Sequence, residues 1–271
     1  MIPDFKSHEL DAAISAAERG GAELQRLFGK RQDKRIKVEN GENLGLVTEA
    51  DLLSEQAIIR ELRQSFPADQ IVSEESKIAQ ASTNARVWIV DPMDGTNNFA
   101  HDIPHFAVSI GLWCNGVPTV AVVFNPISND WFVAVKGQGA WHNQQRLRVS
   151  AESQLDGSLI AIGFYYDRGE MMESTLTSIG ELFRKNIHGV RRFGAASLDL
   201  AWVATGRYEA FFEYRLAPWD FAAGALLVQE AGGMVTNTQG KPLGLNHSSC
   251  LASNGKIHAE VLQTVSKNWP D

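Results

Sequence analysis

The chain is poor in the residues that build covalent or thiolate frameworks. Its 271 residues include two cysteines, Cys114 and Cys250, which are far apart and not part of a C-x-x-C pair. A disulfide framework and a thiolate zinc site are therefore not indicated. We interpret both cysteines as buried thiols.

Long apolar runs are also absent. No stretch approaches the ~20 apolar residues that a membrane-spanning helix needs. Residues 1–30 carry Asp4, Glu9 and Glu18 where a secretory signal would have an apolar core. The sequence thus predicts a cytoplasmic protein with no membrane anchor.

The chain has no excess of basic charge. Its 25 Lys and Arg residues face 32 Asp and Glu residues, which gives a formal net charge of −7. This balance argues against a general nucleic-acid-coating role and permits cation binding at clustered carboxylates. With 44% hydrophobic and 21% charged residues, the composition is that of an ordinary folded globular chain.

Hydrophobic periodicity divides the chain near Ser150. The first half, 1–150, shows helical spacing in 8–28 and 49–65, then strand patterns at 71–72, 87–90, 106–112, 117–124 and 131–135, typical of a mixed sheet. Asn40-Gly41 suggests a loose hairpin or a mobile loop after a basic cluster, Lys30 to Lys37, which we interpret as solvated surface. The second half, 151–271, alternates strands (159–162, 188–192, 208–212) with helices (171–183, 195–204, 219–229) and is typical of an α/β arrangement. We expect the halves to form one compact unit.

The most informative segment is W-I-V-D-P-M-D-G-T-N-N-F, residues 88–99. An apolar strand there ends in Asp91, Asp94 and Thr96, with Pro and Gly bending the chain so that oxygen ligands can converge. Hard cations such as Mg²⁺ prefer such ligands, although Asp, Pro and Gly also favour ordinary turns. The spacing alone leaves both interpretations open.

Several other catalytic templates are excluded by counting. Asp91 and Asp94 are three apart, whereas phosphatases of the haloacid dehalogenase type use Asp-x-Asp. The chain also lacks an EF-hand loop, a P-loop, a G-x-S-x-G elbow and an H-E-x-x-H zinc motif. Gly137-Gln-Gly139 lacks the third glycine of a dinucleotide fingerprint.

Three motifs in order resemble those of the inositol monophosphatase family. D-P-M-D-G-T-N-N-F (91–99) resembles the first signature, P-W-D-F-A-A-G (218–224) with E-A-G-G (230–233) the second, and V-S-E-E-S (72–76) the paired-glutamate motif. Ser73 stands where the family often has glycine. The resemblance covers almost the whole chain and implies the layered αβαβα sandwich of the sugar-phosphatase type, an α/β (α+β) fold.

The resemblance also implies a metal site and a nucleophile. It assigns two or three Mg²⁺ ions to Glu74, Asp91, Asp94, Asp220 and the Met93 carbonyl. Taken one by one, Glu74 also fits a solvated loop acid and Asp220 a first-turn helix acid. Asp51 and Thr96, with Glu74, would be catalytic by orienting a water activated by the metal, while Thr48-x-x-Asp51 also fits a helix capping box.

Substrate contacts are implied by the same resemblance. Glu213 would accept hydrogen bonds from substrate hydroxyls, the Arg191–Ala196 segment would approach the substrate, and Arg191 fits a surface ion pair equally well. The loop at 163–167 is a further candidate wall. The full expected set of substrate contacts is Glu74, Met93, Asp94, Gly95, Thr96, Arg191, Gly194, Ala195, Ala196, Glu213 and Asp220.

The sequence therefore predicts a Mg²⁺-dependent hydrolase that cleaves myo-inositol monophosphate by direct water attack. The resemblance further implies lithium inhibition, a homodimer and a small phosphorylated polyol as substrate. The net charge of −7 argues against nucleic-acid binding. Related activities remain open, namely those of fructose-1,6-bisphosphatase, 3'(2'),5'-bisphosphate nucleotidase and histidinol phosphatase. A non-catalytic regulatory or binding protein on the same fold is the alternative of another class.

Overall fold

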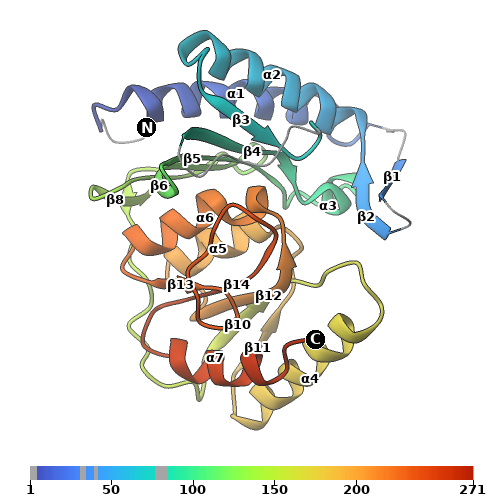
Figure 1. The fold of residues 1–271 in the computed structure, drawn as a ribbon, viewed down its shortest axis with the longest axis vertical. Coiled ribbons are helices and arrows are strands. Elements are labelled where there is room, and N and C mark those ends of the chain that lie inside the picture. Colours follow the sequence, from blue (N-terminus) through green and yellow to red (C-terminus); the bar gives the residue numbers. More distant parts are fainter. Residues whose placement is uncertain (1–4, 31–34, 40–41, 77–84, 271) are drawn as a thin grey trace.

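The computed structural model describes residues 5–30, 35–39, 42–76 and 85–270, in which two sheets alternate with three layers of helices (Figure 1). Helices α1 (His8–Leu27) and α2 (Glu49–Ser65) form the first layer and pack against β6 and β4. Helices α5 (Ala196–Ala204) and α6 (Pro218–Glu230) lie between the sheets. Helices α4 (Glu170–Arg184) and α7 (His258–Lys267) cover the outer face of the second sheet. The predicted αβαβα sandwich is confirmed.

The first sheet has seven strands in sequence order. They are β3 (Gln70–Ser73), β4 (Arg86–Asp94), β5 (Ala107–Cys114), β6 (Val117–Asn125), β7 (Asp130–Val135), β8 (Gly139–His142) and β9 (Gln145–Arg146). β3 is parallel to β4, and every other neighbouring pair is antiparallel. Helices cover both faces, which explains why the central strands consist almost wholly of buried apolar residues.

The second sheet has five strands in the order β11 (Gly189–Arg191), β10 (Leu159–Ile162), β12 (Ala210–Leu216), β14 (Ser248–Ser253) and β13 (Met234–Thr236). β10 is parallel to β11 and β12, whereas β14 is antiparallel to both of its neighbours. The sequence patterns missed β13, β14 and α7 in the second half, and β8, β9 and the short helix 96–100 in the first. They also placed the start of β12 two residues and its end four residues too early.

The central helices join the two halves of the chain. Both α5 and α6 are apolar around most of their circumference, as expected for helices between two sheets. Helix α6 packs against β5 and β6 of the first sheet and against β14 of the second. The change of sheet falls between Arg146 and Leu159, but the two sheets share this middle layer.

Three smaller predictions concern the surface. β1 (Arg35–Glu39) and β2 (Glu42–Val47) form an antiparallel hairpin, while Asn40-Gly41 and part of the basic cluster, 31–34, lie outside the described residues. Both cysteines are free, and Cys250 is buried, but Cys114 is partly exposed at the end of β5, so that prediction was half wrong. In the described ranges, no helix is both long and apolar enough to cross a bilayer.

Candidate active site

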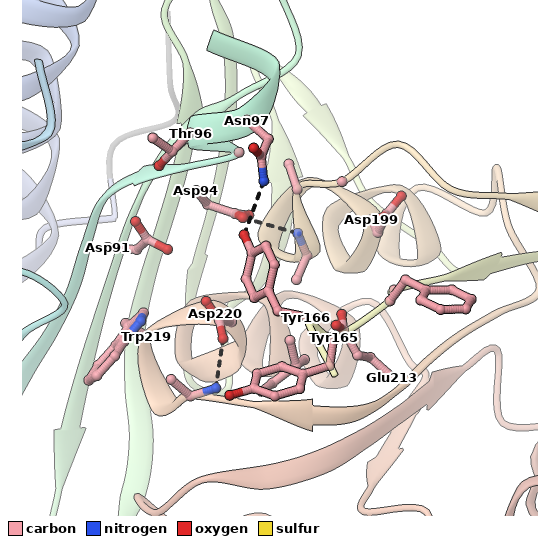
Figure 2. A pocket seen from close by; sticks show the side chains of 18 of the residues that line it. Asp91, Asp94, Thr96, Asn97, Tyr165, Tyr166, Asp199, Glu213, Trp219 and Asp220 are labelled. Atoms are coloured by element: carbon pink, nitrogen blue, oxygen red, sulfur yellow. Dashed lines mark hydrogen bonds between the residues drawn. The ribbon is translucent and has the colours of Figure 1, made fainter. Parts of the chain in front are cut away.

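A cavity of about 500 Å³ lies where β4, α3 (Thr96–Ala100), α5, β12 and α6 meet (Figure 2). Both halves of the chain contribute to its wall. The predicted site residues that line it are Glu74, Asp91, Met93, Asp94, Gly95, Thr96, Gly194, Ala195, Ala196, Glu213 and Asp220. Asp51 and Arg191 are not part of the lining.

The end of β4 presents two carboxylates to this cavity. The β4–β5 register shifts between Asp91 and Asp94, so the bend is a bulge within the strand and not a turn after it. Asp91 accepts a hydrogen bond from the Met93 backbone N–H at 3.0 Å. Gly95 then adopts φ 98°, in the left-handed region that favours glycine, and starts α3. Glu74 follows the parallel strand β3, and its N–H donates to the Val90 carbonyl at 3.2 Å.

Asp94 connects the two halves. Its carboxylate accepts from the Ala196 backbone N–H at 3.2 Å (Figure 2). It also accepts from the Ser197 backbone N–H at 2.7 Å and from the Ser197 hydroxyl at 2.5 Å. These N–H groups lie in the first turn of α5, where amides have no partner within the helix. We expected the Arg191–Ala196 segment to approach the substrate, but the backbone N–H groups of Ala196 and Ser197 already donate to Asp94.

Asp220 lies in the first turn of α6. Its carboxylate accepts from the Ala217 backbone N–H at 2.6 Å, as in the second half of a capping box, and Pro218 begins the helix without needing a donor of its own. The motif P-W-D therefore both starts the helix and directs a carboxylate into the cavity.

Asp51 lies in the first turn of α2, outside the cavity lining, and contacts the lining residue Thr96. One carboxylate oxygen accepts from the Thr96 hydroxyl at 2.9 Å, and the other accepts from the backbone N–H and hydroxyl of Thr48, each at 2.7 Å. The same side chain thus caps α2 and holds Thr96. Both interpretations left open by the sequence describe real contacts.

Burial raises the pKa of several acidic groups in the cavity. It raises the pKa of Asp94 from 3.8 to about 6, with a further increase from the Glu74 charge, while hydrogen bonds from Ser197 oppose the shift. Burial, then Glu74 and Asp94, raise the pKa of Asp220. Burial raises the pKa of Glu213 from 4.5 to about 8 against the opposing effect of Arg192. These acids therefore resist full ionisation in one another's presence.

The chemistry of the cavity side chains shows whether they suit a divalent cation. In the part of the chain that the structure describes, no three His, Cys, Asp or Glu side chains are arranged closely enough to hold an ion as they stand. Asp91, Asp94 and Asp220 each accept from backbone amides in this arrangement. The donor set is nevertheless one of oxygens only. Burial raises the pKa of Asp94 and Asp220, and the charge of Glu74 raises both further, a repulsion that a cation would relieve. In kind, the residues fit a hard divalent cation.

Arginine placement differs from the expectation by one residue. Arg191 ends β11, is exposed, and donates to the Val190 carbonyl at 3.0 Å, whereas Arg192 lines the cavity. Because successive residues of an extended strand point to opposite sides, a one-residue offset decides which arginine faces the site.

Several cavity residues were not anticipated individually, among them Tyr166, Asn97 and Asp199. Tyr166 lies among the carboxylates, and its hydroxyl accepts from the Asn97 side-chain amide at 3.1 Å (Figure 2). Burial raises the pKa of Tyr166 to about 12, so the phenol stays neutral. Asp199 also lines the cavity. Asp199 could have been predicted from the sequence as an acid inside an otherwise apolar helix. Asn97 could have been predicted from its place within the first motif.

Comparison with known proteins agrees with this geometry. A sequence model of the inositol monophosphatase family matches residues 6–269. "Nus factor SuhB" of Pseudomonas aeruginosa is 40% identical over 96% of this chain and 97% of its own length, and "Inositol-1-monophosphatase" of Synechocystis sp. is 40% identical over 95% and 88%. The solved structure of the extragenic suppressor protein suhB from Bartonella henselae has a TM-score of 0.86 at 35% identity, covering 96% of this chain and 99% of that one.

The inositol monophosphatase from Anabaena has a TM-score of 0.83 at 38% identity, with 96% and 95% coverage. This family is one of phosphatases that are generally metal-dependent. The match spans both sheets and all the motifs that build the cavity. The chain belongs to the inositol monophosphatase family.

Proposed function

We propose that this protein is a Mg²⁺-dependent phosphomonoesterase that hydrolyses myo-inositol monophosphate to myo-inositol and phosphate. One observation carries the proposal: four carboxylates, the Thr96–Asp51 hydrogen bond and Glu213 belong to one cavity and its immediate support. The family match and the relative named inositol-1-monophosphatase support it.

Asp51 and Thr96 would position the attacking water. Thr96 has a single hydroxyl proton, and the carboxylate of Asp51 at 2.9 Å is a stronger acceptor than the neutral Met93 carbonyl at 3.1 Å. With the proton directed to Asp51, lone pairs of the Thr96 oxygen remain available to accept from a water in the cavity. Glu74, which lines the same cavity, would hold the proton that this water releases.

Glu74, Asp91, Asp94, Asp220 and the Met93 carbonyl would hold the metal. When bound, Mg²⁺ neutralises phosphate charge and lowers the pKa of water. Without the metal, the negatively charged carboxylates would repel a phosphate dianion from their end of the cavity. The site would therefore require a metal to bind its substrate. At the other end, Gly194, Ala195 and Ala196 would allow the alcohol to approach closely, and Glu213 would accept its hydroxyl groups.

The test is phosphate release by the purified protein, with Mg²⁺ or with EDTA. The substrates are inositol 1-phosphate, fructose 1,6-bisphosphate, adenosine 3',5'-bisphosphate and histidinol phosphate. We expect the highest kcat/KM for inositol 1-phosphate, and only with metal. A higher kcat/KM for another ester would leave the metal-site assignment standing and replace the proposed substrate with that ester. No phosphate release from any ester would contradict the proposal.

A second function is suggested by the relatives named Nus factor SuhB. We propose it as an additional binding role, located on the exposed basic surface that includes Lys30 and Arg35. Charge reversal at Lys30 and Arg35 should reduce retention of RNA in a gel-shift assay and leave the phosphatase rate unchanged. Absence of any RNA retention by the wild type would reject this role. The net charge of −7 argues against a general coating of nucleic acid, so binding should be confined to this basic surface.

We further propose, on the basis of family membership, that the protein is inhibited by lithium, forms a homodimer and is located in the cytoplasm. Sedimentation equilibrium and LiCl titration of the Mg²⁺-dependent rate would test the first two. Fractionation of native cells would test the third.

A further inference from the structure

The E-A-G-G motif at 230–233 belongs to the second family signature but lies outside the catalytic cavity. Helix α6 begins in that cavity with Asp220 and ends at Glu230, which places the motif ~15 Å away along the helix axis. Another cavity, of about 490 Å³, lies there. Its walls are the segment 146–151, the end of α6 and the turn after β14. None of its lining residues has a role in the proposed reaction.

The hydrogen-bond acceptors at the end of α6 already have partners. The two carboxylate oxygens of Glu230 accept from the N–H groups of Gly137 and Gly139, each at 2.8 Å. The carbonyl groups of residues 227–229 accept from the N–H groups of 231–233. This wall of the cavity therefore offers few free acceptors to a ligand.

Three cationic side chains line the same cavity: Arg146, Arg148 and Lys256. Arg146 and Arg148 are exposed on either side of the buried Leu147, so both point away from the core. Within the part of the chain that the structure describes, neither guanidinium group has a hydrogen bond or an ion pair. The Lys256 ammonium group donates to the Ala151 carbonyl at 2.6 Å and retains further N–H donors.

The nearby acid does not neutralise these cations. Glu152 lies near Lys256, but its carboxylate accepts from the next two backbone N–H groups along the chain, at 2.7 and 2.9 Å. The Ser150 hydroxyl oxygen accepts from the Glu152 N–H at 3.1 Å, which leaves the hydroxyl proton to donate. The cavity is thus rich in unused donors and carries an excess of positive charge.

Unused cationic donors match the chemistry of phosphoryl groups. A guanidinium group binds phosphoryl oxygens through two parallel hydrogen bonds, and an ammonium group adds a point charge. Two arginines without other partners can each hold one phosphoryl group. Among the described residues, no aromatic side chain lines the cavity, so a nucleobase would have no stacking partner and the phosphoryl groups would carry the recognition.

We propose that the cavity at the end of α6 is a binding site for a small ligand with a diphosphate group, held by Arg146, Arg148 and Lys256. The group can belong to pyrophosphate or to a nucleoside diphosphate. The inference goes beyond the proposed phosphatase function and does not depend on it, because the two cavities share no lining residue.

Isothermal titration calorimetry of the full chain in EDTA tests the site, because the metal-free carboxylates of the catalytic cavity disfavour anions there. Pyrophosphate and ADP should bind wild type, and inorganic phosphate should bind more weakly. A lower Kd for ADP than for pyrophosphate would identify a nucleoside diphosphate as the ligand, and equal values would show that the diphosphate group alone is recognised. Absence of binding by both compounds would reject the site.

Charge reversal locates the binding. Arg148→Glu and Lys256→Glu should each raise the Kd for pyrophosphate at least about tenfold, because each removes a charged donor and adds repulsion. Arg184→Glu is the matched control, since Arg184 is an exposed arginine in the last turn of α4, outside this cavity. Unchanged Kd values for the two cavity variants, or an equal rise for the control, would overturn the inference.

Two further measurements separate this site from other functions. The Mg²⁺-dependent rate on inositol 1-phosphate should be the same for Arg148→Glu and wild type, so failure of the phosphatase proposal leaves this test intact. If a short single-stranded RNA binds wild type and loses affinity in Arg148→Glu, while pyrophosphate does not bind, the surface serves nucleic acid and the inference is wrong.

Arginine modification by phenylglyoxal tests the wild-type protein without any substitution. Pyrophosphate should protect Arg146 and Arg148 from modification and leave Arg184 reactive, as mapped by mass spectrometry of the peptides. Equal reactivity of the three arginines with and without pyrophosphate would reject the site.

Discussion

At the residue scale, Asp94 combines two tasks that compete for the same atoms. Its carboxylate binds the first turn of α5 through three hydrogen bonds, and it is also a proposed metal ligand. The hydrogen bonds fix the carboxylate in place, and their donors lower the cost of keeping it charged in a buried position.

Asp94→Asn should therefore affect rate far more than stability. We expect the Mg²⁺-dependent rate to fall at least about a hundredfold, because a neutral amide is a poor ligand for a hard cation. The Asn amide group would also face a backbone N–H, so the melting temperature should fall by a few degrees. Phosphate release and circular dichroism measure the two effects. Near-normal turnover at saturating Mg²⁺ would contradict the assignment, as would a variant that Mg²⁺ stabilises as strongly as wild type.

Gly163 shows how closely the backbone approaches Glu213, an acid that we propose binds the substrate. A Cβ atom at this position would lie 1.6 Å from Glu213 Oε2, so Gly163→Ala must displace the Glu213 carboxyl group. We expect a rise of about tenfold in KM for the polyol ester and a loss of ~1–3 kcal/mol in the free energy of unfolding.

The matched control for that variant is Gly180→Ala in α4, where an added Cβ would have only an ordinary contact with Arg184 at 3.6 Å. It should leave KM unchanged and stabilise the helix by ~0.5–1 kcal/mol. Steady-state kinetics and urea unfolding distinguish the two glycines, and equal KM values for both variants would disprove the placement of Glu213.

At the scale of elements, the start of α2 is bound to the site through Asp51. Thr48 and Asp51 close the helix cap, and Asp51 also holds the Thr96 hydroxyl. The buried Ser54 hydroxyl adds a second connection, to the Pro92 carbonyl at 2.9 Å. The outer helix layer thus supports the end of β4 and the start of α3, at Pro92 and Thr96.

Two variants should separate these tasks. Thr48→Ala removes the capping side chain and should cost ~1 kcal/mol of stability with little change in kcat. Thr96→Val removes the hydroxyl and should lower kcat by about two orders of magnitude. It should also cost ~1–3 kcal/mol of stability, because buried Asp51 loses a hydrogen-bond donor. Thr96→Ser should retain most of the rate and the stability. Parallel urea unfolding and kinetics check both, and a Thr96→Val enzyme with a normal kcat would exclude a role for this hydroxyl.

At the scale of the whole molecule, the buried acids make the stability of the metal-free protein depend on pH. Burial raises the pKa of Glu213 from 4.5 to about 8, so between these pH values the folded chain holds a proton that the unfolded chain has released. Since the folded state binds more protons, the free energy of unfolding should fall as pH rises through this window and level off above it. Asp94, with a pKa of about 6, adds to the lower part of the fall.

Urea unfolding in EDTA at several pH values tests this dependence, and Glu213→Gln provides the comparison. The variant has no titrating group at this position, so its stability should fall less steeply with pH than that of wild type. Parallel curves for the two proteins would mean that Glu213 ionises in the folded state as it does in water.

The sequence predicted most elements because their patterns were strong. The helical spacing in 8–28 and the apolar strand at 87–90 correspond to α1 and β4. β14 was missed because S-S-C-L-A-S has little apolar content, and its burial comes from lying between β12 and β13. Helix α7 did carry a signal, Val261 and Val265 at helical spacing, which was not used.

The site was predictable where the family motifs fixed both residue type and position, as at Asp91, Asp94 and Asp220. It was not predictable where the outcome depended on tertiary packing. Which of Arg191 and Arg192 faces the cavity is set by the end of β11, and the place of Asp199 is set by the docking of α5. Such details follow from the relation between elements and not from local composition.

The strand order of the second sheet has a consequence for synthesis of the chain on the ribosome. β12 ends at Leu216, yet the neighbour that covers one of its edges, β14, spans Ser248–Ser253. At ~5–20 residues per second, the nascent chain carries an open, apolar strand edge for a time on the order of seconds. If translation stalls in that interval, the second sheet lacks β14, and the open edge of β12 could pair with the same strand of another nascent chain on the polysome.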